Sequence, residues 1–139
     1  MSCGGHEHSE FASPLACSIW RAAQTQQLAR VKEIIEKGTQ SANSKDESGY
    51  SALHYAARTG NNSIVNYLIS KNAQVNVATP GGDTPLHRAA YMGHESTCEI
   101  LLNHKADPNK KNSDNQTPLH RAEANNKPQI LELLIKYNA

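Results

Sequence analysis

The amino-acid sequence predicts an all-α solenoid of stacked helix-turn-helix units that are joined by hairpin-like finger loops. The first observation is a hexamer, TPLHRA, which occurs at residues 84–89 and again at 117–122. Leu86 and Leu119 of these copies are 33 positions apart, and Leu53 stands 33 positions before Leu86 in the weaker copy SALHYA. The second observation is that only 37% of the 139 residues are hydrophobic, with one Phe and one Trp, which suits a thin, elongated core. A fixed period of this size favours a repeat architecture.

The period extends over four units, of which the first is atypical. The run IWRAA at residues 19–23 aligns with LHYAA at 53–57, 34 positions later. The repeats are therefore expected at about 14–45, 46–78, 79–111 and 112–139. A chain of this length is about one domain long, so we expect a flexible N-terminal segment, residues 1–12, followed by one repeat domain, residues 13–139.

The first helix of a unit is predicted to begin at the TP pair. A threonine accepts a backbone N–H at a helix N-terminus, and proline suits the next position because its missing donor is not needed there. In the third unit this predicts a helix from Pro85 to about Tyr91. Each first helix is expected to end at a residue that adopts a left-handed backbone. This residue is Gly60 in the second unit, Gly93 in the third and Asn126 in the fourth.

The second helix of a unit is predicted from an apolar stripe at positions i, i+1, i+4 and i+5, over about three turns. The stripe consists of Ile64, Val65, Leu68 and Ile69, then Cys98, Leu101 and Leu102, then Ile130, Leu131, Leu134 and Ile135. Polar, turn-forming stretches follow these helices and lead to Gly49, Gly82 or Asn115 before the next unit. These stretches are the predicted finger loops.

At this point the sequence resembles the ankyrin repeat family. The segment GDTPLHRAAYMGH at residues 82–94 matches the family pattern at every fixed position, and the resemblance covers roughly residues 20–139. The departures fall in the end units, which have Trp20 for His, Gln26 for Gly, Glu123 for Ala and Asn126 for Gly. Terminal units of a stacked array have a neighbour on one side only, so we expect polar caps at both ends and a monomer.

Composition and motifs exclude several classes of function. The formal net charge of +1 predicts neither nucleic-acid nor membrane binding, and no apolar run is long enough to span a bilayer. Three cysteines at unrelated spacings, with no signal peptide, indicate a reducing compartment, either cytoplasm or nucleus. The sequence has no nucleophile elbow, phosphate-binding loop or H-E-x-x-H motif, so we expect no enzyme activity and no cofactor.

Three histidines recur at the repeat period: His54, His87 and His120. In the ankyrin family this histidine is structural, so the resemblance implies rings that hydrogen-bond to backbone groups of adjacent loops. A shared metal ion is excluded, because successive units stack about 10 Å apart whereas metal–nitrogen bonds are about 2 Å long.

The N-terminal segment contains a candidate metal site, because Cys3, His6, His8 and Cys17 have side chains that can bind zinc. Their spacing lacks the paired C-x-x-C form that makes such a pattern specific. An alternative function is therefore a metal-regulated or RNA-contacting adaptor that uses this segment and the arginines at positions 21, 88 and 121. RNA binding would require a wider basic patch than the sequence offers.

Three asparagines also recur after the second helices: Asn43, Asn76 and Asn109. The simpler interpretation is a local turn with a local hydrogen bond. The family resemblance adds a second one, hydroxylation by an asparaginyl hydroxylase, because some ankyrin repeats are modified at this position.

The resemblance implies that the fingers and first helices line a concave surface that binds a protein partner. Arginine, tyrosine and methionine are enriched at such interfaces. Arg21, Arg88 and Arg121, which follow the histidine position, either contribute to binding or simply solvate the helices. The candidate partner-binding residues are Tyr50, Tyr55, Arg58, Asp83, Arg88, Tyr91, Met92 and Arg121.

Overall fold

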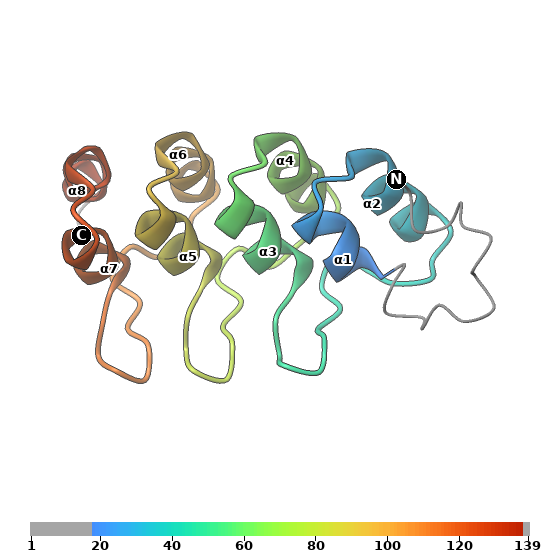
Figure 1. Cartoon of the computed structure of the whole chain (residues 1–139), viewed down its shortest axis with the longest axis horizontal. Helices are drawn as coiled ribbons and strands as arrows, with labels where there is room; N and C mark the ends of the chain where they lie inside the picture. The colour runs from blue at the N-terminus through green and yellow to red at the C-terminus, as the bar shows by residue number, and fades with distance from the viewer. Residues whose placement is uncertain (1–17, 138–139) are drawn as a thin grey trace.

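The computed structural model describes residues 18–137, which form a row of four helix pairs (Figure 1). The pairs are α1 Ile19–Gln24 with α2 Leu28–Glu36, α3 Ala52–Thr59 with α4 Asn62–Ser70, α5 Pro85–Met92 with α6 Glu95–Asn103, and α7 Pro118–Ala124 with α8 Pro128–Lys136. The described part contains no strand, only an isolated antiparallel bridge between Lys45 and Ser51. The all-α prediction is confirmed, and α5 ends one residue beyond the predicted Tyr91.

The first helices begin where the threonine and histidine positions predict. The Thr84 hydroxyl accepts a hydrogen bond from the His87 backbone N–H, while the His87 ring accepts one from the Thr84 backbone N–H. This reciprocal capping satisfies two donors at the helix N-terminus. Ser51 with His54 and Thr117 with His120 repeat it.

The first helices also end as predicted. Gly60 and Gly93 follow α3 and α5 with φ of 76° and 82°, and Asn126 takes the corresponding place after α7 with φ of 53°. Gln26 holds the same left-handed backbone in the first unit, with φ of 60°. The chain therefore reverses at every unit, even where glycine has been replaced.

The helices are arranged in two rows. Helices α1, α3, α5 and α7 pack side by side next to the finger loops, and α2, α4, α6 and α8 form the outer row (Figure 1). The apolar side chains of both rows make one continuous core along the array, including Leu53, Leu68, Leu86, Leu101 and Leu134. This thin core agrees with the low hydrophobic content of the sequence.

The predicted apolar stripe is wrong at the end of the array. Ile135 is 62% exposed, whereas Leu133, which the stripe omitted, is buried. The reason is that α8 packs on α6 and α7, and no described helix covers its other side. The expectation of an entirely polar C-terminal cap is corrected at this residue.

The recurring asparagines connect neighbouring units. The Asn43 side chain donates to the Asn72 carbonyl at 2.9 Å and accepts from the Gln74 N–H at 2.7 Å. Asn76 makes the same pair of bonds with the Lys105 carbonyl at 3.1 Å and the Asp107 N–H at 2.7 Å. The prediction of a purely local hydrogen bond is therefore wrong for Asn43 and Asn76, because their partners lie one repeat further along the chain. Hydroxylation of these asparagines stays a prediction.

The remaining expectations concern the N-terminal segment, metal binding and membrane-spanning helices. The flexible segment 1–12 and the Cys3, His6, His8 and Cys17 set lie outside the described residues. Within residues 18–137, no cluster of three or more His, Cys, Asp or Glu side chains is placed to hold a metal ion. In the same range, no helix combines the length and apolar character needed to cross a membrane.

Candidate partner-binding groove

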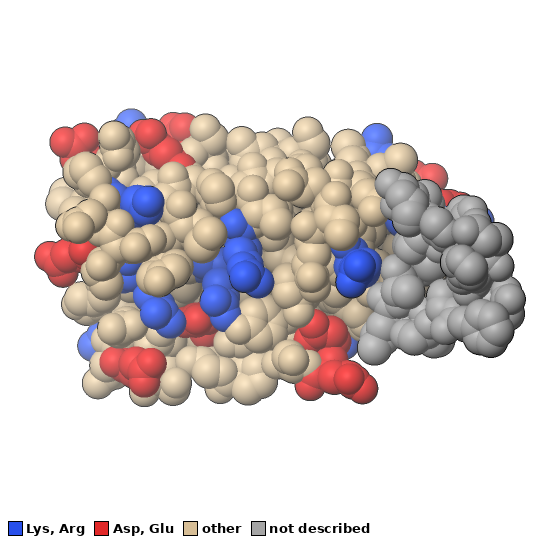
Figure 2. Space-filling view, in the orientation of Figure 1, with Lys and Arg blue, Asp and Glu red and all other residues tan. Residues whose placement is uncertain are grey.

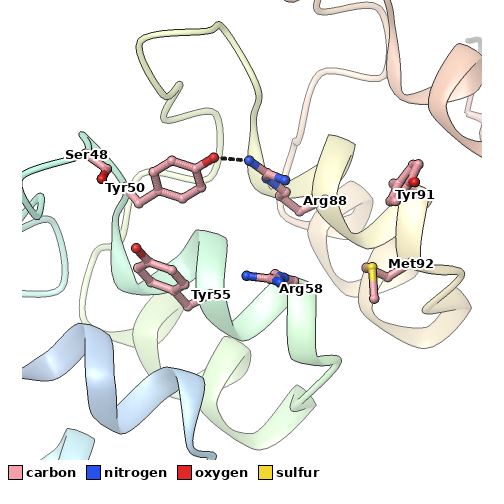
Figure 3. A pocket seen from close by; sticks show the side chains of 7 residues that line it. All are labelled: Ser48, Tyr50, Tyr55, Arg58, Arg88, Tyr91 and Met92. Carbon is pink, nitrogen blue, oxygen red and sulfur yellow. Dashed lines mark hydrogen bonds between the residues drawn. The ribbon is translucent and has the colours of Figure 1, made fainter.

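The row of first helices carries a hollow beside the finger loop that precedes α3, which we call the second finger because it belongs to the second unit. The hollow has a volume of about 410 Å³ and is shown in Figure 3. Six of the eight residues predicted to bind a partner line it together with Ser48, and these are Tyr50, Tyr55, Arg58, Arg88, Tyr91 and Met92. The structure thus brings together residues that lie as far apart in the sequence as positions 50 and 92.

A second hollow of about 480 Å³ adjoins the first. The two share Tyr55, Arg58 and Met92 as lining residues, and we call the two hollows together the groove. The second hollow reaches the first unit, because it is also lined by Gln24, Gln26, Thr59 and His94. The groove therefore extends across three consecutive units.

Two stacked rings form one wall of the groove. The centroids of Tyr50 and Tyr55 are 5.5 Å apart with an interplanar angle of 26°. The Tyr55 hydroxyl donates to the Asp46 carboxylate, whose other oxygen accepts the Ser48 and Tyr50 backbone N–H groups at 2.9 Å each. Burial, followed by the hydrogen bond to Asp46, raises the pKa of Tyr55, so the phenol keeps its proton and its donor role. These bonds hold the second finger and the ring wall in fixed positions.

Arg88 continues this wall toward the third unit. Its guanidinium lies 5.0 Å from the centroid of the Tyr50 ring and donates to the Tyr50 hydroxyl. It also pairs with the Asp83 carboxylate at 3.7 Å. A cation over a tyrosine face is attracted by the ring quadrupole, and the ion pair adds to this attraction. Arg88 is therefore held by the protein itself, and the prediction that it simply solvates its helix is wrong.

Asp83 lies below the surface. It is 8% exposed, accepts a hydrogen bond from the Asn112 amide at 2.8 Å and pairs with Arg121 at 3.3 Å. Burial acts to raise the pKa of Asp83, but the Asn112 hydrogen bond and the arginine charges outweigh it, and the pKa lies below its ordinary value. The prediction that Asp83 contacts a partner directly is corrected, because this burial makes it an internal counter-ion for two arginines.

Arg121 completes the network. Besides Asp83, its guanidinium approaches the Tyr91 ring at 5.8 Å from the centroid. Arg121 lines neither hollow of the groove and instead stands behind Tyr91. Of the eight predicted residues, Tyr50, Tyr55, Arg58, Arg88, Tyr91 and Met92 therefore line the groove, while Asp83 and Arg121 lie outside its lining and contact residues that line it.

Comparison with known proteins supports the family on which these predictions rest. The family model described as ankyrin repeats (3 copies) matches residues 19–112 and 79–139. The chain belongs to the ankyrin repeat family. It is also 38% identical over 61 residues to the human "Ankyrin repeat domain-containing protein 39". This match covers 44% of the chain and spans only 33% of the human protein.

Ankyrin repeats are protein–protein interaction modules, and proteins of this family are typically not enzymes. The comparisons give no support to a metal-regulated or RNA-contacting adaptor. The structure also weakens the arginine row as a phosphate-binding surface, because Arg88 and Arg121 share the Asp83 carboxylate. The zinc-binding set of that alternative lies outside the described residues.

Two of the three recurring histidines, His54 and His87, have the structural role that the resemblance implies. The ring of His120 is exposed and bonds to Thr117 of its own unit instead, so the expectation of a contact with an adjacent loop is wrong for His120. The Nε2 of His54 donates to the Asp83 carbonyl at 2.9 Å, and that of His87 donates to the Gln116 carbonyl at 2.8 Å. In both rings Nδ1 accepts the backbone N–H of the cap residue, so the neutral Nε2–H tautomer is the one that satisfies both contacts. Burial lowers the pKa of His54 to about 4 and also lowers the pKa of His87. The rings of His54 and His87 therefore connect successive units.

Several residues that line the groove were not predicted from the sequence, and His94 is the one among them that contacts the preceding unit through a hydrogen bond. His94 lines the second hollow, its ring donates to the Arg58 carbonyl at 2.9 Å, and a Cβ placed on Gly60 would lie 2.7 Å from it. Glycine at position 60 thus provides the space for this ring as well as the turn. The GH pair at 93–94 was part of the family pattern, but its contact with the preceding unit became visible only in the structure.

Proposed function

We propose that this ankyrin domain binds an extended segment or loop of a protein partner in the groove, as a monomer and without chemistry of its own. The observation that carries this proposal is the combination of exposed apolar side chains with a fixed ring wall. Tyr91 and Met92 are each 42% exposed, although large hydrophobic side chains are otherwise mostly covered in this part of the chain. Exposed apolar groups of this kind are common where proteins bind each other.

Preorganisation supports the same function. Asp46 fixes the ring wall, and Asp83 holds the two arginines that contact Tyr50 and Tyr91. A groove that is ordered before binding loses little conformational entropy when a partner docks. The cysteine pattern of the sequence leads us to propose the cytoplasm or nucleus as the compartment where the partner is met.

Site-directed photo-cross-linking tests the proposal. A photoreactive benzoylphenylalanine replaces Met92 in the full chain, and a matched protein carries it in place of Glu132, which is exposed on α8 away from the groove. Both proteins are irradiated in lysate, and the adducts are identified by mass spectrometry. We expect one protein to be linked through a short contiguous segment at position 92 and not at position 132. Adducts at 132 with none at 92 would move the interface to another face and refute the proposal.

A further inference from the structure

The groove contains one guanidinium, that of Arg58, for which the described residues provide no counter-ion. Arg58 is exposed at the end of α3 and lines both hollows. Its side chain makes no ion pair or hydrogen bond with any residue in the range 18–137, whereas Arg88 is paired with Asp83 and Tyr50. Figure 3 shows the Arg58 guanidinium among the lining side chains with no bond to any of them. Arg58 is therefore available to a ligand.

The lining of the groove is free of carboxylates. No Asp or Glu lines either hollow, and Figure 2 shows Lys and Arg side chains over the middle of this face with most Asp and Glu side chains toward its margins. The repeat register explains part of this absence, because Tyr50 stands one period before Asp83. Arg88 donates to Tyr50 over the same 38-residue separation at which Arg121 donates to Asp83. Tyr50, which lines the groove, thus places a neutral phenol at the repeat position that the Asp83 carboxylate occupies in the next unit.

An apolar surface lies next to this charge. Met92 lines both hollows with Arg58, and Tyr91 lines the first hollow with it. A bound segment can therefore place a charged side chain on Arg58 and an apolar side chain on Met92 and Tyr91. Met adapts its shape to different apolar groups, while the planar guanidinium matches a carboxylate through two parallel hydrogen bonds.

We propose that the groove recognises an acidic protein segment, in which an Asp or Glu carboxylate pairs with Arg58 and a neighbouring apolar side chain packs on Met92 and Tyr91. This inference rests on the proposed function and adds the chemistry of the partner. A carboxylate is favoured over a phosphate because phosphopeptide sites generally assemble several arginines, and the second arginine of this groove is already paired with Asp83.

Peptide selection provides the probe for a test. Random twelve-residue peptides are displayed and selected on the full chain, and the enriched sequences are synthesised with a fluorophore for anisotropy measurements. Groove binders are recognised by loss of binding to Met92→Glu. We expect these peptides to contain Asp or Glu beside an apolar residue. We also expect Arg58→Gln, or amidation of that carboxylate, to weaken binding about 10-fold to 100-fold, as for a charge-assisted hydrogen bond.

Three further comparisons separate the charge pair from other effects. If the Arg58 guanidinium and the peptide carboxylate pair with each other, Arg58→Gln combined with the amidated peptide should weaken binding little more than either change alone. Arg58→Glu should bind the peptide again when its acidic residue is replaced by lysine. Lys136→Glu is the matched control, because it makes the same charge change at an exposed residue in the last turn of a helix, here α8. It should bind like the wild type, and circular dichroism verifies that every variant is folded.

The outcomes distinguish this inference from the proposed function. Peptides that require Met92 but bind Arg58→Gln as well as wild type would overturn the inference and leave the proposed function standing. Tighter binding when phosphoserine replaces the acidic residue would overturn the choice of a carboxylate. Selection that yields no peptide sensitive to Met92→Glu would overturn both proposals.

Discussion

The buried histidines should make the stability of this domain depend on pH. His54 is 1% exposed, and its Nδ1 accepts the Ser51 N–H while its Nε2 donates to the Asp83 carbonyl. A second ring proton would have to replace the lone pair that accepts from Ser51, in a site that water does not reach. Burial accordingly lowers the pKa of His54 from an ordinary 6.5 to about 4. The folded state therefore resists protonation.

The sign and size of the effect follow from proton linkage. Between pH 6.5 and pH 4 the unfolded chain binds a proton at His54 and the folded chain does not, so acid favours unfolding in this window. From pH 7.5 to pH 5 the loss in free energy of unfolding is about 2 kcal/mol for this histidine. His87 contributes in the same direction because its pKa is also lowered. The stabilisation from Asp83 is lost only below about pH 4, outside this comparison.

Urea unfolding at pH 7.5 and pH 5, at equal ionic strength and followed by circular dichroism, measures this loss. His54→Gln removes the titrating group and keeps a donor near the Asp83 carbonyl, so its loss between the two pH values should be about 2 kcal/mol smaller than that of the wild type. Ile69→Val on α4 serves as the control, since it lowers stability without removing a histidine. An equal pH dependence in wild type and His54→Gln would refute this account of the histidine.

Two further substitutions test the junction between the third and fourth units by urea unfolding at pH 7.5. Gly82→Ala should lower the free energy of unfolding by about 3 kcal/mol, because φ is 85° and a Cβ would lie 2.8 Å from the Asn112 backbone. Gly38→Ala in the first unit is the control. Its φ is 74° and no atom lies within 4 Å of the added Cβ, so it should lower the free energy of unfolding by about 1 kcal/mol. Equal losses would contradict the steric argument. Asp83→Ala should cost about 2 to 3 kcal/mol, because it leaves the buried Asn112 amide unpaired, and a loss below 1 kcal/mol would show that Asp83 is not a structural centre.

Much of the fold could be predicted because the repeat places the same local chemistry at each helix end. Thr84 and Gly93 define α5 through a cap and a left-handed turn, both of which depend on residues close in sequence. Ile135 was predicted to be buried because the apolar period cannot show where the array lacks a covering neighbour. The error at Asn76 has a related cause, because its partners Lys105 and Asp107 belong to the next unit.

The groove was predictable in its residue types but not in its contacts. Arginine, tyrosine and methionine at variable positions of the third unit indicated one face of the array, and Arg88, Tyr91 and Met92 line the groove on that face. Nothing local in the sequence distinguishes a paired arginine from a free one. Arg58 and Arg88 differ because Asp83 and Tyr50 lie within reach of Arg88 only, and both reach it through the stacking of units. The charge that the groove presents therefore depends on inter-unit geometry as well as on composition.

The polar contacts across units also determine what can disturb the groove. Arg88 of the third unit reaches back to Tyr50 of the second, and Arg121 of the fourth reaches back to Asp83 of the third. In a linear array each unit acts directly on its neighbours only, so the shape of the groove depends chiefly on the contacts among the first three units. Loosening of the fourth unit can still reach Arg88 through one carboxylate, because Asp83 pairs with both arginines. Asp83 thus connects Arg121 of the C-terminal unit with Arg88 in the lining of the groove.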